Sequence, residues 1–330
     1  MEDKNPKNIP LINWLALTAL ALVLIPACSL LPQAAGDRDS ATYDPALISE
    51  SFQYEGVDRT ALFYIPYPLH SEGVPVVFVL HGAGGTAERM MQKTTEGRWN
   101  ELAFQEKFIV VYPQGWNRRW NDCRSDISEP LTSQDDVGYL LFLLDWLAEE
   151  YPVDRSQVYA AGHANGGMMA MRLALEAPGT FQAVFSNNGP LAAQSKCAWP
   201  GVPVSVAFLA GTADPLIPYA GGEVGLAGEG LGTVLSAEET VQTWLAINGI
   251  DAAPEVTDFR DRIKDDGSTA TRLIYQGETA QVWFLRVDGG GHAWPGKEPF
   301  TRIEAQSNGD KNRDINAADL AWEFFQLSSR

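Results

Sequence analysis

Short apolar runs that alternate with amphipathic segments limit this 330-residue chain to few folds. Val76–Leu80 and Phe108–Tyr112 are continuous apolar runs, which is typical of strands covered on both faces. Between them, and again over Asp135–Glu150, apolar residues recur three and four positions apart, which predicts helices. An alternation of strand and helix predicts an α/β protein with a mostly parallel central sheet and helices on both faces.

The same alternation continues to the end of the chain, after an antiparallel pair at the start. The pair is expected over Ser51–Gly56 and Arg59–Pro66. Further strands are expected at Gln157–Ala161, Ala183–Ser186, Val204–Leu209, Thr271–Tyr275 and Val282–Val287, and further helices at Gly166–Glu176, Ser236–Asn248 and Ala317–Gln326. In such a sheet the chemistry lies beyond the carboxyl ends of the strands, so the loops there are where site residues are expected.

One predicted strand-to-helix turn, Gly162–Gly167, has the glycine spacing of a nucleophile elbow, G-x-S-x-G. Small residues are needed two positions before and two after the nucleophile, because the backbones of strand and helix approach closely there. The nucleophile position itself is occupied by Ala164. Taken alone, the segment is also compatible with a plain turn that happens to use glycines.

Two polar residues follow later strands in the chain order of an α/β-hydrolase triad. Asp214 comes after Val204–Leu209, and His292 lies in a glycine-rich loop after Val282–Val287. A carboxylate in such a loop can orient the imidazole and hold its tautomer. The catalytic positions are therefore predicted to be Ala164, Asp214 and His292.

The glycine-rich segment His81–Gly85 follows the first buried strand, where this fold donates one backbone N–H to the oxyanion hole. Ala83, or its neighbour Gly82, is the candidate, and the N–H of Asn165 is the second donor. His81 is interpreted as structural. A phosphate-binding loop is excluded because no G-K-[ST] follows.

A series of further segments carries a wider resemblance, in this order: Leu80–Gly82, Val111–Gly115, Asp135–Gly138, Val158–Tyr159, Asn165–Ala170, Gly211–Pro215, Gly289–Gly296 and Trp322–Phe325. On these residues the chain resembles the secreted polyhydroxybutyrate depolymerase and feruloyl esterase family, with an α/β-hydrolase fold. The resemblance implies hydrolysis of carboxylic esters in polyhydroxyalkanoate oligomers, feruloylated sugars or acetylated polysaccharides. It also implies that no metal or organic cofactor takes part.

The family has serine where this chain has Ala164, and a methyl group cannot attack a carbonyl. Loss of a triad serine costs on the order of a millionfold in turnover, so the chain as written is expected to be a nearly inactive Ser–His–Asp ester hydrolase scaffold. The chain could be a serine-to-alanine knockout of an ordinary esterase, or a natural pseudoenzyme that binds an ester or saccharide in the same cleft. A third explanation is another nucleophile, with Ser186 and Ser195 as candidates by type. Retention of Asp214 and His292 favours recent or deliberate loss.

Residues 1–28 have the features of an export signal. Lysines precede an apolar stretch from Ile9 to Ala27, and Leu24–Cys28 resembles the lipobox of a bacterial lipoprotein, which would be acylated at Cys28. An uncleaved transmembrane anchor is the alternative, because the stretch could just span a bilayer. Both place the protein outside the cytoplasm, lipid-anchored to the outer face of a bacterial membrane or secreted. Residues 29–48 are predicted to be a flexible tether and residues 49–330 the α/β-hydrolase domain.

Cys123 and Cys197 are the cysteines that remain when Cys28 is set aside. An even pair in an exported chain favours a disulfide, with two separate thiols as the alternative. The family resemblance supports the bridge, because many relatives carry cysteines at these positions. We predict a disulfide near the mouth of the site.

The net charge of -18 argues against nucleic acid or an anionic membrane surface as partner, because phosphates are held mainly by clustered Lys and Arg. The expected partner is a small-molecule or polymer ester, and the membrane is contacted only through the lipid anchor. Trp116, Trp120 and Trp294 lie in loops near the catalytic end and are predicted to line the substrate site, with core packing as the alternative.

Two acidic segments are assigned to helix termini. Asp135 and Asp136 precede a helix and fit an N-cap and a partner for the helix dipole. Asp310–Asn316 has the alternating oxygen ligands of a calcium loop but lacks the glycine at its sixth position. We therefore predict that it caps the last helix and that the chain has no metal site.

Overall fold

The structure is a computed structural model that describes residues 46–127, 133–198, 201–225 and 230–328. By compactness the chain divides into Met1–Thr42 and Tyr43–Arg330, and the described residues all belong to the second unit. The predicted signal, Cys28 and most of the predicted tether therefore lie outside the described residues. Within the described ranges, no helix combines the length and hydropathy needed to cross a bilayer.

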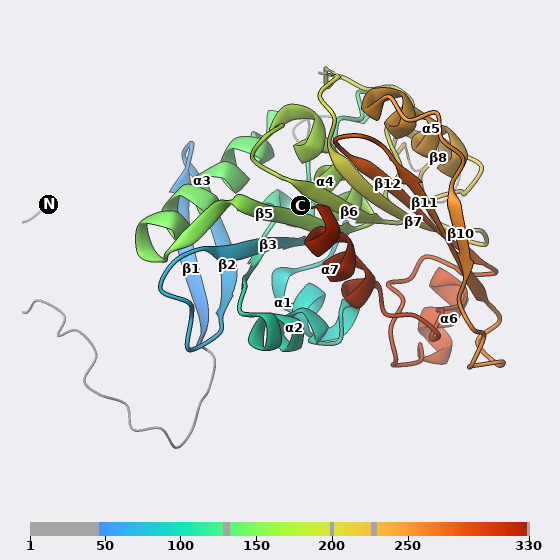
Figure 1. The fold of residues 1–330 in the computed structure, drawn as a ribbon, viewed down its shortest axis with the longest axis horizontal. Helices are drawn as coiled ribbons and strands as arrows, with labels where there is room; N and C mark the ends of the chain where they lie inside the picture. The colour runs from blue at the N-terminus through green and yellow to red at the C-terminus, as the bar shows by residue number, and fades with distance from the viewer. Residues whose placement is uncertain (1–45, 128–132, 199–200, 226–229, 329–330) are drawn as a thin grey trace, which may run out of the picture. The chain divides into compact units, whose positions relative to one another are not determined.

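A ten-stranded sheet forms the centre of the domain, in the order β1-β2-β4-β3-β5-β6-β7-β12-β11-β10 (Figure 1). Its strands are β1 Ala46–Tyr54, β2 Val57–Ile65, β3 Val74–Leu80, β4 Ile109–Pro113, β5 Val153–His163, β6 Ala183–Asn187, β7 Ser205–Gly211, β10 Glu255–Asp258, β11 Thr269–Gln276 and β12 Gln281–Asp288. A separate two-stranded ribbon consists of β8 Gly222–Glu223 and β9 Thr233–Val234.

The central strands run parallel from β4 through β3, β5, β6 and β7 to β12. Antiparallel strands flank them on both sides, with β1 and β2 next to β4, and β11 and β10 next to β12. The second antiparallel edge was not predicted. Its cause is local: only residues 277–280 separate β11 from β12, which is too short for the crossover that parallel strands need.

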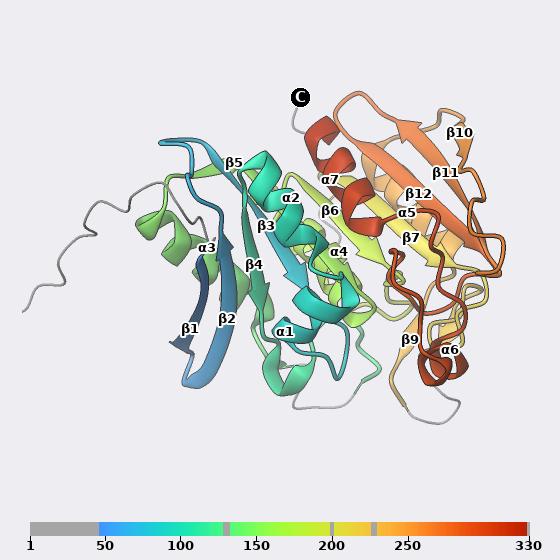
Figure 2. The same cartoon turned by 90° about the horizontal axis from the view of Figure 1, so that it is seen from below.

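Helices cover both faces of the sheet. They are α1 Ala87–Arg89, α2 Arg98–Glu106, α3 Asp136–Glu150, α4 Asn165–Glu176, α5 Ala237–Asn248, α6 Arg302–Asn308 and α7 Ala317–Ser328, together with the π-helical turn η1 Met90–Thr94 and the 3-10 turn η2 Trp116–Arg118. In Figure 1, α3, α4 and α5 lie above the strands and α1, α2 and α7 below, and Figure 2 has the latter three in front of the sheet.

Two apolar cores follow from this arrangement, because alternate residues of each strand face opposite layers. In β3, Val76 and Phe78 pack with α3, α4 and α5, whereas Val77 and Val79 pack with α1, α2 and α7. The prediction of a mostly parallel sheet with helices on both faces is confirmed.

The first residues of two helices and one strand test assignments made from the sequence. Asp135 caps α3 by accepting a hydrogen bond from Gly138 N, and Asn316 Oδ1 accepts from Ala318 N at the start of α7. Residues 46–48, which the sequence assigned to the tether, belong to β1 instead. They are ordered because their backbone pairs with the far end of β2, where Ala46 lies opposite Ile65.

Candidate active site

The turn between β5 and α4 places Ala164 in a strained backbone conformation, with φ 52° and ψ -120°. Non-glycine residues rarely adopt this region, which costs on the order of 1–3 kcal/mol. The flanking glycines are required by close backbone approach: a Cβ on Gly162 would collide with the carbonyl of Gly166, and a Cβ on Gly166 with the carbonyl of Leu80. The chain therefore has the geometry of a nucleophile elbow at a residue that has no nucleophile.

Asp214 and His292 are in direct contact. His292 Nδ1 lies 2.7 Å from Asp214 Oδ2, and both side chains are largely buried. The other carboxylate oxygen of Asp214 accepts from the backbone N–H groups of Leu216 and Ile217, both at 2.8 Å. Because these donors hold the carboxylate in place, Nδ1–H can donate to it and Nε2 is left as the acceptor of the imidazole.

Two asparagines at the end of β6 hold the loop that carries His292. Asn187 Nδ2 donates to the carbonyl of Ala293 at 2.9 Å, and Asn188 Nδ2 donates to the carbonyls of Gly291 and Ala293 at 3.2 and 3.3 Å. Asn188 Oδ1 also accepts from Gly211 N at 3.0 Å, at the start of the Asp214 loop. These residues were missed in the sequence, where two consecutive asparagines after a buried strand were the available signal.

His163, which the sequence analysis also missed, packs against the imidazole of His292. The two ring centroids are 4.7 Å apart, and Asn187 Nδ2 lies 2.7 Å from His163 Nδ1. Burial lowers the pKa of His163 well below its usual range, and the neighbouring His292 adds to this effect. His163 is therefore neutral, and it packs against His292 without placing a second positive charge beside it.

His81 shapes the glycine-rich loop after β3. Its Nε2 accepts from Gly115 N at 3.0 Å, so the proton lies on Nδ1, which donates to the carbonyl of Gly82 at 2.8 Å. Burial lowers the pKa of His81 to about 4, so the ring stays neutral and keeps both contacts. The loop it holds presents Gly82 and Ala83 to the same cavity as Asn165.

The Asn165 side chain is fixed by the loop that follows η2. It accepts from Trp120 N at 2.8 Å and donates to Trp120 O at 2.9 Å and to Asp122. Asp122 in turn accepts from Arg124 with both carboxylate oxygens, from Nε at 2.9 Å and from Nη2 at 2.7 Å. The disulfide Cys123–Cys197 ties this loop to the segment after β6, with the Cα atoms 5.3 Å apart.

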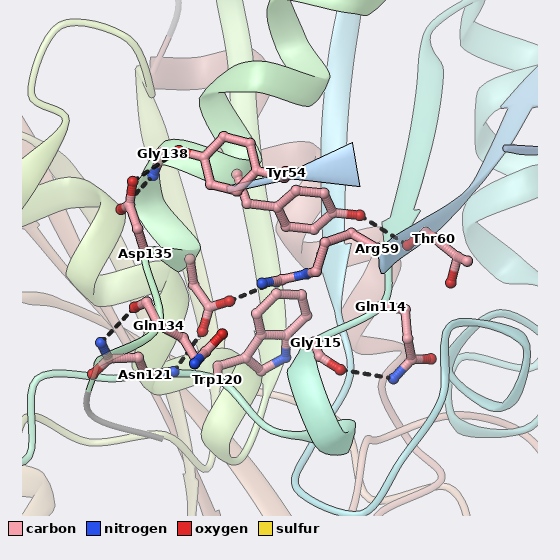
Figure 3. Close-up of polar contacts among 12 residues, drawn as sticks. Tyr54, Arg59, Thr60, Gln114, Gly115, Trp120, Asn121, Gln134, Asp135 and Gly138 are labelled. Carbon is pink, nitrogen blue, oxygen red and sulfur yellow. Dashed lines mark hydrogen bonds and ion pairs between the residues drawn. The ribbon is translucent and has the colours of Figure 1, made fainter. Parts of the chain in front are cut away.

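Behind that loop lies a buried ion pair (Figure 3). Asp136 accepts from Arg59 Nη2 at 2.6 Å and from Asn121 N at 2.8 Å. Figure 3 shows Arg59 and Asn121 on either side of the Trp120 ring. Asp136 stands in the first turn of α3, as predicted, and its fully buried carboxylate also anchors the Trp120–Arg124 loop.

A cavity of about 490 Å³ lies beyond the carboxyl ends of β3, β5 and β12. Ala164, Asn165, Ala83, His292 and Trp294 all line it, together with an apolar wall. That wall consists of Met168, Ile217, Val224 and Leu231.

The three tryptophans predicted to line the substrate site, with core packing as the alternative, lie in different places. Among the described residues, neither Trp116 nor Trp120 lines the cavity. Trp120 is fully buried because its indole Nε1 donates to the carbonyl of His81 at 2.8 Å and its ring packs on that histidine. Trp294 lines the cavity and lies edge-on to His163, with ring centroids 6.5 Å apart.

The serines considered as replacement nucleophiles are placed elsewhere. Ser186 is fully buried in β6 and donates to the carbonyl of Gly189 at 2.7 Å. Ser195 Oγ accepts from Cys197 N at 3.1 Å, and neither serine is among the cavity-lining residues that the structure describes. The structure therefore brings neither hydroxyl to His292.

A doubly covered parallel sheet, an elbow after β5, and an Asp–His pair in the loops after β7 and β12 together define an α/β-hydrolase of the esterase type. Residues 53–216 match the family model described as "Putative esterase". The chain is 30% identical over 266 residues to "Putative esterase NocK" of Nocardia uniformis subsp. tsuyamanensis, an alignment that covers 78% of this chain and 75% of that protein. The chain belongs to this esterase family.

More distant relatives agree with the resemblance found in the sequence. "Probable feruloyl esterase C" of Aspergillus niger is 23% identical over 86% of this chain and 89% of its own length. "Poly(3-hydroxybutyrate) depolymerase" of Ralstonia pickettii is 27% identical over 82% of this chain and 57% of its own length. The solved structure of an acetyl xylan esterase from Aspergillus awamori shares the fold, with a TM-score of 0.55 at 16% identity, covering 85% of this chain and 99% of that one.

Proposed function

We propose that this chain is the scaffold of an extracytoplasmic carboxylic ester hydrolase whose Ser–His–Asp chemistry is interrupted at Ala164. The observation that carries the proposal is the strained elbow conformation of Ala164 in the cavity that His292, hydrogen-bonded to Asp214, also lines. Backbone strain of this kind persists only where the surrounding structure imposes it, and it clusters at functional sites. The family relationship supports ester hydrolysis as the chemistry of the scaffold.

In the proposed mechanism a serine at position 164 attacks the ester carbonyl. His292 Nε2 takes the serine proton as the C–O bond forms, and Asp214 stabilises the resulting imidazolium through Nδ1. The N–H groups of Asn165 and of Ala83 or Gly82 receive the oxyanion. The imidazolium then protonates the departing alcohol, and water, deprotonated by His292, releases the acid from the acyl-enzyme.

With Ala164 in place, the first step has no attacking group. The cavity, the oxyanion donors and the imidazole remain, so the chain should bind esters and lack all but a trace of turnover, on the order of a millionfold below a serine enzyme. The names of the relatives point to feruloyl, hydroxybutyrate and acetylxylan esters as substrates to try. No cofactor is required by this chemistry.

Export belongs to the same proposal. The support is the signal-like segment of residues 1–28 with its lipobox at Cys28, and the pairing of Cys123 with Cys197, since disulfides persist in oxidising compartments.

The test is the single substitution Ala164→Ser. We expect it to raise the hydrolysis of p-nitrophenyl butyrate at least about a thousandfold and to allow labelling by a fluorophosphonate probe, whereas the chain as given takes no label. The matched control is the double variant Ala164→Ser/His292→Ala, which should lose the gain. If Ala164→Ser stays inert on butyryl, hydroxybutyrate, feruloyl and acetyl esters and takes no probe, the proposal is wrong and a binding role becomes the better explanation.

A further inference from the structure

The charged residues around the cavity are unusual for this chain. The sequence has 24 basic and 42 acidic residues, so any six charged residues should include about two basic ones. Among the described residues that line the cavity, the single carboxylate is Glu304, and the basic residues are Arg89, Lys93, Arg119, Arg124 and Lys311. A positive cavity in an acidic protein is not explained by composition.

Two of the five cations are neutralised inside the protein. Arg124 is bound by both oxygens of Asp122, and Lys311 pairs with Glu96. Glu96 also accepts from the backbone N–H groups of Lys297 and Glu298, so its pair with Lys311 belongs to the support of that loop. These cations are structural, and their charge is already compensated.

The other three cations, Arg89, Lys93 and Arg119, have exposed side chains. Within the part of the chain that the structure describes, none of them has an ion pair or a side-chain hydrogen bond. The hydrogen bonds from Thr301 lower the pKa of Glu304, and the charge of Arg89 adds to this effect. The Glu304 carboxylate caps α6, where it accepts from Thr301 N and Oγ1 at 2.9 and 2.8 Å. We call Arg89, Lys93 and Arg119 the basic rim.

The basic rim is built next to the oxyanion loop. Arg89 and Lys93 are four residues apart on the helical turns α1 and η1, directly after Gly82–Thr86. Arg119 follows η2, and that turn is joined to the oxyanion loop by the hydrogen bond from Gly84 N to Arg118 O at 2.8 Å. The backbone positions that carry the rim are therefore fixed next to the oxyanion loop.

The apolar wall comes from the other side of the sheet. Val224 follows β8 and Leu231 precedes β9, and in Figure 1 β8 lies above the strands while α1 lies below them. A ligand that spans the cavity would thus meet aliphatic side chains at one end and cations at the other, with Ala164 lining the same space.

We infer that the ester this site takes carries an anionic group, a carboxylate in the simplest case, which the basic rim of Arg89, Lys93 and Arg119 recognises while the uncharged part lies on the apolar wall. The inference rests on the proposed function, since it names the substrate class of the same cavity. Exposed ion pairs contribute a factor of about two to five each, so three together should give a preference of about tenfold or more at low ionic strength. Salt should weaken that preference, because exposed charges are screened.

Two ligands with the same skeleton test the inference: mono-4-nitrophenyl adipate, which has a free carboxylate, and methyl 4-nitrophenyl adipate, in which the carboxylate is capped. In the Ala164→Ser enzyme, kcat/KM should favour the free acid about tenfold, and the ratio should fall towards one in Arg89→Gln/Lys93→Gln/Arg119→Gln or at high salt. The control is Arg155→Gln, an exposed cation on β5 paired with Asp145, which should keep the ratio.

The chain as given provides a second readout that does not depend on turnover. Because Ala164 cannot be acylated, calorimetry can measure the affinity of both intact esters directly, and the acid should bind about tenfold tighter until the rim is removed. Hydrolysis of both esters at equal rates would overturn the inference and leave the proposed function standing. Selective binding of the acid without hydrolysis by Ala164→Ser would support the basic rim and overturn the proposed function. Equal binding of the two ligands, or binding of neither, overturns the inference.

Discussion

Replacement of Arg59 by Met should destabilise the domain by removing one partner of a fully buried ion pair. The side chains of Arg59 and Asp136 are 3% and 0% exposed, and Arg59 Nη2 lies 2.6 Å from Asp136 Oδ1. Methionine keeps much of the volume and the contact with the Tyr139 ring, over which the guanidinium now lies at 3.9 Å. The substitution therefore isolates the effect of the lost charge.

The magnitude follows from what remains around Asp136. Removing one member of a buried pair costs about 3–5 kcal/mol, because the other charge is left unpaired. Asp136 keeps the hydrogen bond from Asn121 N, so the lower end, about 3 kcal/mol, is expected. For a domain of this size that lowers Tm by roughly 5–10 °C.

The deficit should also depend on pH in a defined direction. Burial raises the pKa of Asp136, and Arg59 opposes this, so the pKa rises further in Arg59→Met. A carboxyl group whose folded pKa lies above its unfolded value adds stability below the unfolded pKa and loses it as pH rises through the folded pKa. The variant should therefore lie closest to the parent in acid, and the gap in stability should widen as pH rises through the raised pKa of Asp136.

Urea unfolding followed by circular dichroism, in a series of buffers from acid to neutral pH, measures this difference. The matched control is Arg155→Met, which breaks the exposed pair with Asp145, whose side chains are 55% and 65% exposed, and should change stability by less than about 0.5 kcal/mol. A loss below about 1 kcal/mol in Arg59→Met, or a deficit that grows in acid, would refute the reasoning.

Other outcomes are expected from the disulfide, the N-terminus and the active-site loops. Cys123→Ser/Cys197→Ser should lose about 4 kcal/mol of stability, since the bridge closes a sequence separation of 74, and alkylation of the untreated protein should modify neither cysteine. Globomycin should cause a precursor to accumulate, and Cys28→Ser should block lipid attachment; a mature chain that starts elsewhere without lipid contradicts this. Asn188→Ala in an Ala164→Ser background should lower kcat about tenfold to a hundredfold more than KM changes, by displacing the His292 loop. The control is Asn248→Ala, which removes a buried side-chain amide that is hydrogen-bonded to the backbone of Val204, outside the cavity. It should lower stability and leave kcat unchanged.

Much of this protein was predictable from local signals in the sequence. Apolar runs of strand length identify the central strands, because a parallel strand buried on both faces has no polar position. The elbow is visible because Gly162 and Gly166 are demanded by steric contact between neighbouring backbone segments. The positions of Asp214 and His292 follow from the rule that such residues lie in loops after successive strands.

The tertiary structure decided what depends on contacts between distant residues. Asn188 joins the loops of Asp214 and His292 by hydrogen bonds that span 23 and 103 positions. A periodic pattern in the sequence cannot predict partners so far apart. Trp120 could have faced the substrate or the core, and its bond to the His81 carbonyl placed it in the core. Charge follows the same division: composition reports only the total of -18, whereas the fold gathers Arg89, Lys93 and Arg119 around one cavity, because electrostatic potential depends on where charges lie in space.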